Sequence, residues 1–274
     1  MSLLASVTLD PGTQGGTGAG IASWFEAVLA GPLAEVMDRE RSGGATSLAV
    51  TRMEESEESK EFFLPSDGWG PMRQELMRDP ETANVVLLLP DSERPIAHVR
   101  SSSIRVRRPN VEVQLLLDEQ MARLDDGEYC ESLVDFLVSA LNSVNPAFGH
   151  VSADQPMTEK TNLDVVLGRK VRKSVAEARQ FLRGYSWVTV CPVELAERLG
   201  GVSSLESSGA FCSVIPLAAG GVVLQATETI FEYSDEAMRR VFSALAPVLP
   251  PGFPAFDPAN PDVRFVPKDA RQLG

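Results

Sequence analysis

Histidine and cysteine are scarce in this sequence, which limits the chemistry that it can carry. The 274 residues include two histidines, His98 and His150, and neither lies near a carboxylate or a cysteine at the spacing of metal ligands. The three cysteines, Cys130, Cys191 and Cys212, are odd in number and widely spaced, so they indicate neither a disulfide framework nor a zinc site. No H-E-x-x-H, EF-hand or G-x-S-x-G motif occurs. We therefore expect no metal and no cofactor.

Long apolar runs and an excess of basic residues are also missing. The runs "VVLLL" at 85–89 and "GGVVLQA" at 220–226 are far shorter than the roughly 20 residues that a membrane-spanning helix needs. The amino terminus reaches Asp10 with no basic residue before its short apolar part, which argues against a secretory signal and favours a cytoplasmic protein. The formal net charge of −13 disfavours binding to nucleic acid or to an anionic membrane. It would attract a basic partner, although solubility alone also explains an acidic composition.

Apolar residues make up 43% of the chain, enough for one large core or two small ones. Alternation and β-branched character predict strands at 2–9, 47–51, 84–90, 148–154 and 185–190, a pair of strands within 96–117, and a hairpin that turns at Gly220-Gly221. Spacings of three and four residues predict helices near 21–37, 130–144, 192–199 and 235–246. Gly31-Pro32 is expected to kink or break the first of these helices.

This order of elements predicts an α+β fold. We expect an open, mostly antiparallel sheet with helices packed on one face, in which two β-plus-helix halves share one core. A single domain would cover residues 1–252, and a proline-rich tail at 253–274 would wrap the surface. The glycine-rich stretch at 10–20 precedes a predicted helix, but it matches neither G-x-G-x-x-G nor a G-K-[ST] phosphate loop. We interpret it as a linker.

Two charged tracts are candidate binding surfaces. The acidic tract "EESEESKE" at 54–61 is expected to form a solvated hairpin tip. Its glutamates are the partner-binding candidates: Glu54, Glu55, Glu57, Glu58 and Glu61. The basic run from Arg169 to Lys173 could contact phosphates, but it contains no interleaved aromatic residue. A solvated helix face is therefore the preferred interpretation of the basic run.

A nucleophilic site could assemble in space from Cys191, His150 and Asp154. Cys191 ends a β-rich run just before Pro192, and the amino terminus of the following helix could lower the pKa of its thiol. Trp187 and the neighbouring valines instead favour a small, buried core residue. We expect no catalytic residue; the alternative hypothesis is a small-molecule enzyme that uses cysteine and histidine.

Five segments carry a family resemblance: "DGWGPMRQELM" at 67–77, "FGHVSAD" at 148–154, "LRGYSWVTV" at 182–190, "ELAERLGGVSSL" at 194–205 and "VFSALAPVLPPG" at 241–252. In these segments the chain resembles the immunity proteins of type VI secretion, which are found encoded beside secreted antibacterial toxins. The resemblance spans about residues 5 to 252. It implies a cytoplasmic protein that binds a cognate toxin and neutralises it by surface complementarity, and it transfers no catalytic residue.

Overall fold

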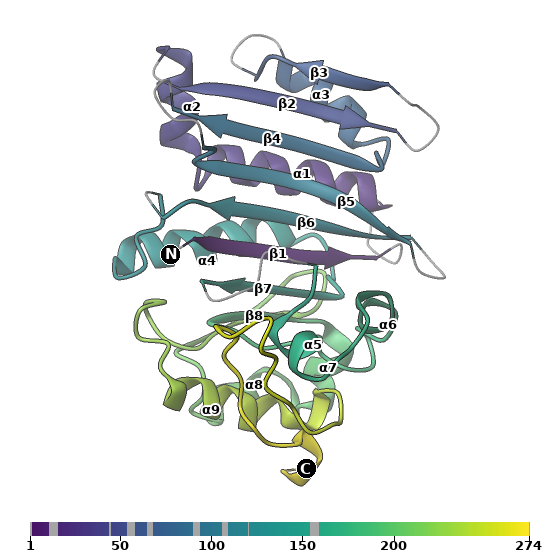
Figure 1. The fold of residues 1–274 in the computed structure, drawn as a ribbon, viewed down its shortest axis with the longest axis vertical. Helices are drawn as coiled ribbons and strands as arrows, with labels where there is room; N and C mark the ends of the chain where they lie inside the picture. The colour runs from purple at the N-terminus through teal and green to yellow at the C-terminus, as the bar shows by residue number, and fades with distance from the viewer. Residues whose placement is uncertain are drawn as a thin grey trace.

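In the computed structural model, ten strands form one antiparallel sheet with helices packed against it (Figure 1). The structure describes residues 2–10, 16–43, 45–53, 58–64, 68–89, 94–105, 109–119, 121–153 and 159–273. In their order across the sheet, the strands are β3 (Ser59–Phe62), β2 (Thr46–Arg52), β4 (Thr82–Leu88), β5 (Ala97–Arg105), β6 (Pro109–Leu117), β1 (Leu3–Leu9), β7 (Phe148–Ser152), β8 (Val188–Cys191), β10 (Val222–Gln225) and β9 (Ser213–Pro216). The α+β class and the open antiparallel sheet are confirmed.

Nine α-helices accompany the sheet within the described residues. They are α1 (Gly16–Ala30), α2 (Ala34–Arg41), α3 (Trp69–Leu76), α4 (Gly127–Leu141), α5 (Asn162–Val166), α6 (Val171–Ala176), α7 (Val193–Arg198), α8 (Gly201–Ser207) and α9 (Asp235–Leu245). The predicted helices at 130–144, 192–199 and 235–246 therefore correspond to α4, α7 and α9. Within the described part of the chain, none of the helices combines the length and the apolar character needed to cross a membrane.

One face of the sheet is apolar because every second strand residue points toward it. A row of cross-strand neighbours on this face has no exposed surface: Val85, Val99, Leu115, Ala5 and Val151. Figure 1 shows α1 and α4 lying behind these strands, and their contact includes Trp24 and Phe136, whose ring centroids are 5.0 Å apart. Burial of these aliphatic and aromatic groups is the main stabilising contribution to this half of the core.

The predicted helix at 21–37 is in fact two helices. A turn at 31–33 separates α1 from α2, and Pro32 has no backbone N–H with which to continue the first helix. This confirms the expected break at Gly31-Pro32. The predicted start was wrong, because α1 begins at Gly16, inside the stretch that was interpreted as a linker.

Close packing explains why glycines open this helix. A Cβ atom placed on Gly18 would lie 2.5 Å from the carbonyl oxygen of Met77, and one on Gly20 would lie 2.7 Å from Cδ1 of Leu9. Glycine has low helix propensity, which favoured the linker interpretation. The start of α1 lies so close to the end of α3 and to β1 that residues without a side chain are required there. This packing requirement outweighs the low helix propensity of glycine.

Three strands of the carboxyl-terminal half, β7, β8 and β10, are covered on both faces. Every residue of β7, β8 and β10 is buried, and the turn after β9 uses Gly220 and Gly221 with positive φ, as expected for this hairpin. Beyond residue 252 the chain has little regular structure, yet the backbone N–H of Val266 donates to the hydroxyl of Tyr185 over 3.0 Å. Val263 and Val266 join the same hydrophobic core as the strands.

We predict that Gly18→Ala lowers the free energy of unfolding by about 1–3 kcal/mol, since the new methyl group would overlap the Met77 carbonyl. Gly70→Ala is the matched control: Gly70 also lies in a helix, α3, but nothing lies within 4 Å of the position of its Cβ. That change should be neutral or stabilise by up to about 1 kcal/mol. Urea titration of both variants measures the difference, and equal effects would contradict the packing argument.

Candidate partner-binding face

On the face of the sheet opposite α1 and α4, no described helix or loop covers β2, β4 and β5, and Figure 1 views this face directly. Leu48 lies opposite Val86, Val86 opposite His98, and His98 opposite Leu116, so these side chains share one side of the sheet. We define the open face by eight half-buried or exposed side chains in the central part of this side of β2, β4, β5 and β6: Leu48, Val50, Asn84, Val86, His98, Arg100, Ser102 and Leu116. It combines aliphatic and hydrogen-bonding groups.

One cross-strand row connects the open face with the buried half of the sheet. Its members, in order from β3 to β9, are Glu61, Val50, Asn84, Arg100, Gln114, Ser6, His150, Thr189, Leu224 and Val214. Glu61 is exposed, Asn84 and Arg100 are half-buried, and the residues from Gln114 to Leu224 are buried. The same side of the sheet is therefore an accessible surface at one end and part of the interior at the other.

Polar side chains on the open face are held in fixed positions by their neighbours. His98 Nε2 lies 3.0 Å from Asn84 Oδ1, and Arg100 Nε donates to Gln114 Oε1. Burial lowers the pKa of His98, and the positive charge of Arg100 lowers it further, so the imidazole is neutral near pH 7. The open face thus presents hydrogen-bonding groups whose rotamers are already restricted.

The hydrogen bonds continue inward from the open face to a buried cluster. Gln114 Nε2 donates to Ser6 Oγ over 3.4 Å, and Ser6 Oγ donates to Glu112 Oε1 over 3.0 Å. Burial raises the pKa of Glu112, while the nearby guanidinium of Arg183 acts in the opposite direction. The carboxyl group of Glu112 is thereby placed between the open face and the interior.

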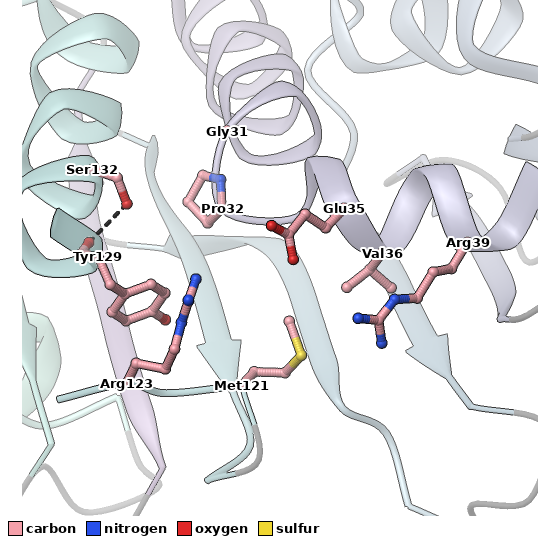
Figure 2. Close-up of a pocket in the computed structure, with 9 residues that line it drawn as sticks. All are labelled: Gly31, Pro32, Glu35, Val36, Arg39, Met121, Arg123, Tyr129 and Ser132. Carbon is pink, nitrogen blue, oxygen red and sulfur yellow. Dashed lines mark hydrogen bonds between the residues drawn. The ribbon is translucent and has the colours of Figure 1, made fainter. Parts of the chain in front are cut away.

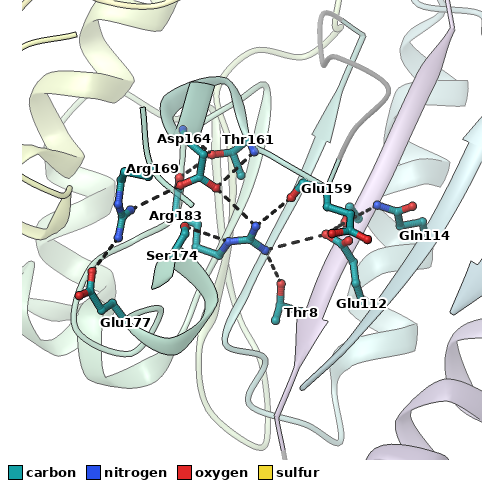
Figure 3. Close-up of polar contacts among 11 residues, drawn as sticks. Thr8, Glu112, Gln114, Glu159, Thr161, Asp164, Arg169, Ser174, Glu177 and Arg183 are labelled. Carbon is teal, nitrogen blue, oxygen red and sulfur yellow. Dashed lines mark hydrogen bonds and ion pairs between the residues drawn. The ribbon is translucent and has the colours of Figure 1, made fainter. Parts of the chain in front are cut away.

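Arg183 is the centre of this buried cluster (Figure 3). Its side chain is 1% exposed and donates hydrogen bonds to three neutral acceptors: Thr8 Oγ1 at 2.9 Å, the Glu159 carbonyl at 3.1 Å and Ser174 Oγ at 3.3 Å. It also lies 3.4 Å from Asp164 Oδ2 and 3.9 Å from Glu112 Oε1. These partners come from β1, β6, α5, α6 and the segment before α5, so one guanidinium joins all of them.

His150 lies beside this cluster in an environment that excludes its charge. It is buried on β7, its ring centroid is 5.4 Å from that of Phe148, and neither ring nitrogen has a hydrogen-bond partner among the described residues. Burial, and secondarily the charge of Arg183, lowers the pKa of His150 to about 3. The imidazole is therefore neutral and structural at ordinary pH.

The interpretation of the basic run was wrong for Arg169. This residue precedes α6 and is 10% exposed, because its guanidinium lies 2.9 Å from Glu177 Oε2 and 3.6 Å from Asp164 Oδ1. Arg172 and Lys173 are exposed on α6, as a solvated helix face requires. The local sequence could not reveal that Asp164, five positions earlier, turns back toward Arg169.

The acidic tract lies at the outer edge of the sheet. Glu54, Glu55 and Glu57 fall outside the described residues. Glu58 is exposed just before β3, and Glu61 is exposed on β3, opposite Val50 of the open face. Glu61 is therefore a strand residue that continues the row of the open face, and no described contact assigns a partner-binding role to the tract.

Cys191 and His150 lie on adjacent strands but offer no accessible nucleophile. Cys191 ends β8 with no exposed surface, and burial raises the pKa of its thiol to about 12. Asp154, the third member of the hypothetical site, falls outside the described residues. The expectation that Cys191 is a buried core residue is confirmed. Across the described ranges, no group of three or more His, Cys, Asp or Glu side chains could hold a metal ion.

Comparison with protein-family models and with curated proteins gave no significant match. Among solved structures, the chain is similar to one described as Pseudomonas aeruginosa T6SS protein PA0821, with a TM-score of 0.59 and 10% sequence identity. The alignment covers 99% of this chain and 80% of that chain. At this identity the likeness is one of fold, and it extends over both halves of the sheet.

We predict that Arg183→Met lowers the free energy of unfolding by about 3–5 kcal/mol, since it leaves the buried carboxyl groups of Glu112 and Asp164 without their cation. Arg172→Met is the control on α6, where the side chain is exposed, and should change stability by less than about 0.5 kcal/mol. Urea unfolding followed by circular dichroism compares the two variants. Similar losses would show that the buried cluster contributes nothing beyond a surface arginine.

We also predict that the folded protein reacts with a thiol reagent at Cys212 alone, which is exposed, whereas Cys130 and Cys191 react only after unfolding. Absorbance titration of the wild type and of Cys212→Ser counts the reactive thiols in each state. Cys191→Ala should retain biological activity and lose only modest stability, because a small buried group is removed. Fast labelling of Cys191 in the folded state, or lost activity in a folded Cys191→Ala variant, would support the enzyme hypothesis.

Proposed function

We propose that this chain is an immunity protein that binds a cognate secreted antibacterial toxin in the cytoplasm and neutralises it through the open face. The observation that carries the proposal is a wide side of the sheet that no described segment covers and whose polar side chains are already held by hydrogen bonds. A protein that acts by surface complementarity needs such a surface and no catalytic residue.

The composition of the open face supports binding to a protein. Leu48, Val86 and Leu116 supply apolar area, and Arg100 and His98 supply directional hydrogen bonds between them. Interfaces combine an apolar centre with polar groups in this manner, and arginine is frequent among their strongest contacts. Because Asn84 and Gln114 already restrict the polar side chains, less conformational entropy is lost on binding.

The fold and the sequence segments support the type VI secretion context. The structurally similar protein is described as a T6SS protein, and the five segments of this chain resemble immunity proteins of that system. Both observations favour the neutralisation of a secreted toxin over a metabolic function.

The charge of the chain supports a basic partner. The formal net charge is −13, and Glu58 and Glu61 lie at the edge strand that continues into the open face. An acidic inhibitor attracts a basic toxin over long distances and raises the association rate by about 10-fold to 1,000-fold at low salt. Many toxins that act on nucleic acid carry basic sites, and an acidic inhibitor can occupy such a site.

We predict that the product of a neighbouring gene is toxic, that co-expression of this chain restores growth, and that Leu48→Arg weakens the complex by at least about 10-fold. Leu48 is the most exposed apolar side chain of the open face, and a long cation at its position would be desolvated in the complex without a partner. Leu273→Arg is the control, because Leu273 is 47% exposed, against 48% for Leu48, and lies in the carboxyl-terminal tail. Growth rescue and titration calorimetry report on both variants.

Two outcomes separate the parts of this proposal. If no neighbouring product is toxic or bound, the proposed immunity function is wrong. If both arginine variants bind as the wild type does, only the role of the open face is wrong. Replacement of Glu54, Glu55, Glu57, Glu58 and Glu61 by Gln should mainly slow association and flatten its salt dependence. Binding that is indifferent to salt and to these changes would contradict only the electrostatic part.

A further inference from the structure

A pocket of about 400 Å³ lies away from the open face, between the turn that joins α1 to α2 and the beginning of α4 (Figure 2). Its floor and walls include Pro32 and Val36 on one side and Met121 on the other. Pockets that hold small molecules have volumes of this order and combine an apolar lining with a few polar groups. None of its lining residues belongs to the open face, so the pocket is a separate feature.

The hydroxyl of Tyr129 is the first sign that the pocket is built for a ligand. Tyr129 is 8% exposed, and its hydroxyl oxygen is buried with no hydrogen-bond partner among the described residues. Figure 2 shows the ring extending from α4 toward the side of the pocket that holds Arg123 and Met121. A buried hydroxyl without a partner costs about 1–3 kcal/mol, which a ligand could offset by supplying an acceptor.

Charged groups of both signs line the same pocket as Tyr129. Glu35 and Arg39 are exposed on α2, and no ion pair within the described residues holds either of them. On the opposite side, Arg123 is 61% exposed, and its guanidinium lies 5.0 Å from the centre of the Tyr129 ring and 3.6 Å from Asp126 Oδ2. Two guanidinium groups and one carboxylate therefore face the same pocket in a protein whose net charge is strongly negative.

We propose that this pocket binds a small zwitterion of the α-amino acid class with an apolar side chain. The two arginines would hold the carboxylate, because guanidinium groups bind carboxylates through charge-assisted hydrogen bonds. Glu35 would accept hydrogen bonds from the ammonium group, and the side chain would lie against Pro32, Val36 and Met121. Movement of Arg123 off the ring of Tyr129 toward the carboxylate would give the hydroxyl access to its missing acceptor. The inference is independent of the toxin-binding role.

Three probes of one shape test the assignment of each charge. L-leucine carries both groups, 4-methylpentanoate lacks the amino group, and 3-methylbutylamine lacks the carboxylate. We predict that the purified protein binds L-leucine about 10-fold more tightly than either analogue, which corresponds to about 1.4 kcal/mol for the lost charged contact. Ligand-observed NMR and calorimetry measure the three affinities up to about 10 mM, the range of weak binding.

Variants of the lining residues complete the experiment. Arg39→Gln and Arg123→Gln should weaken L-leucine by about 10-fold or more, and Glu35→Gln should weaken L-leucine while leaving 4-methylpentanoate unchanged. Arg172→Gln, an exposed arginine on α6, is the control and should have no effect. Absence of L-leucine binding, equal affinity for all three probes, or binding that is indifferent to both arginine variants would overturn the proposal.

Discussion

The guanidinium of Arg183 is the constraint on which the organisation of the sheet depends. Removing a cation from water costs several kcal/mol unless its donors and its charge are matched, and Arg183 finds its partners on β1, β6, α5 and α6 at once. The segment that contains α5 and α6 is therefore held against the side of the sheet that α1 and α4 leave uncovered. Lifting it away would leave Glu112 and Asp164 without their cation in the interior.

The position of this buried cluster decides where the sheet remains accessible. Ser6, Glu112 and Gln114 are buried beside the cluster. Along the cross-strand row, the side chains then become more exposed, from Gln114 through Arg100 and Asn84 to Glu61. The hydrogen bond between Arg100 and Gln114 crosses this boundary. The side chain of Arg100 on the open face is thus held by a buried residue, and a side chain that is already held loses less conformational entropy if the surface binds a partner.

The alternation of apolar and polar residues in the sequence was sufficient to predict most strands. The same alternation indicates which residues of β5 belong to the open face. In "AHVRSSS" at 97–103, Ala97 and Val99 point to the core while His98 and Arg100 point outward. The row itself could not be predicted, since β6, β1 and β7 are neighbours only after the chain has folded. The predictions for Arg169 and for the glycines at the start of α1 were wrong for the same reason. The folded chain places Glu177 beside Arg169 and Met77 beside Gly18, and the local sequence does not show these contacts.

Pairing of the interior charges also explains how an acidic chain can have an open face that contains no carboxylate. Arg183 and Arg169 are opposed by Glu112, Asp164 and Glu177 at short range, so the interior contributes little to the excess of acid. That excess is carried by the solvent-facing residues, where it acts beyond contact distance to about the Debye length of 8–10 Å. The open face contains Arg100 and His98 rather than carboxylates, so contact there depends on shape and hydrogen bonds. In the proposed complex, the acidic surface residues would therefore provide the long-range attraction, and the side chains of the open face would provide the contacts. Substitutions could change the two contributions separately.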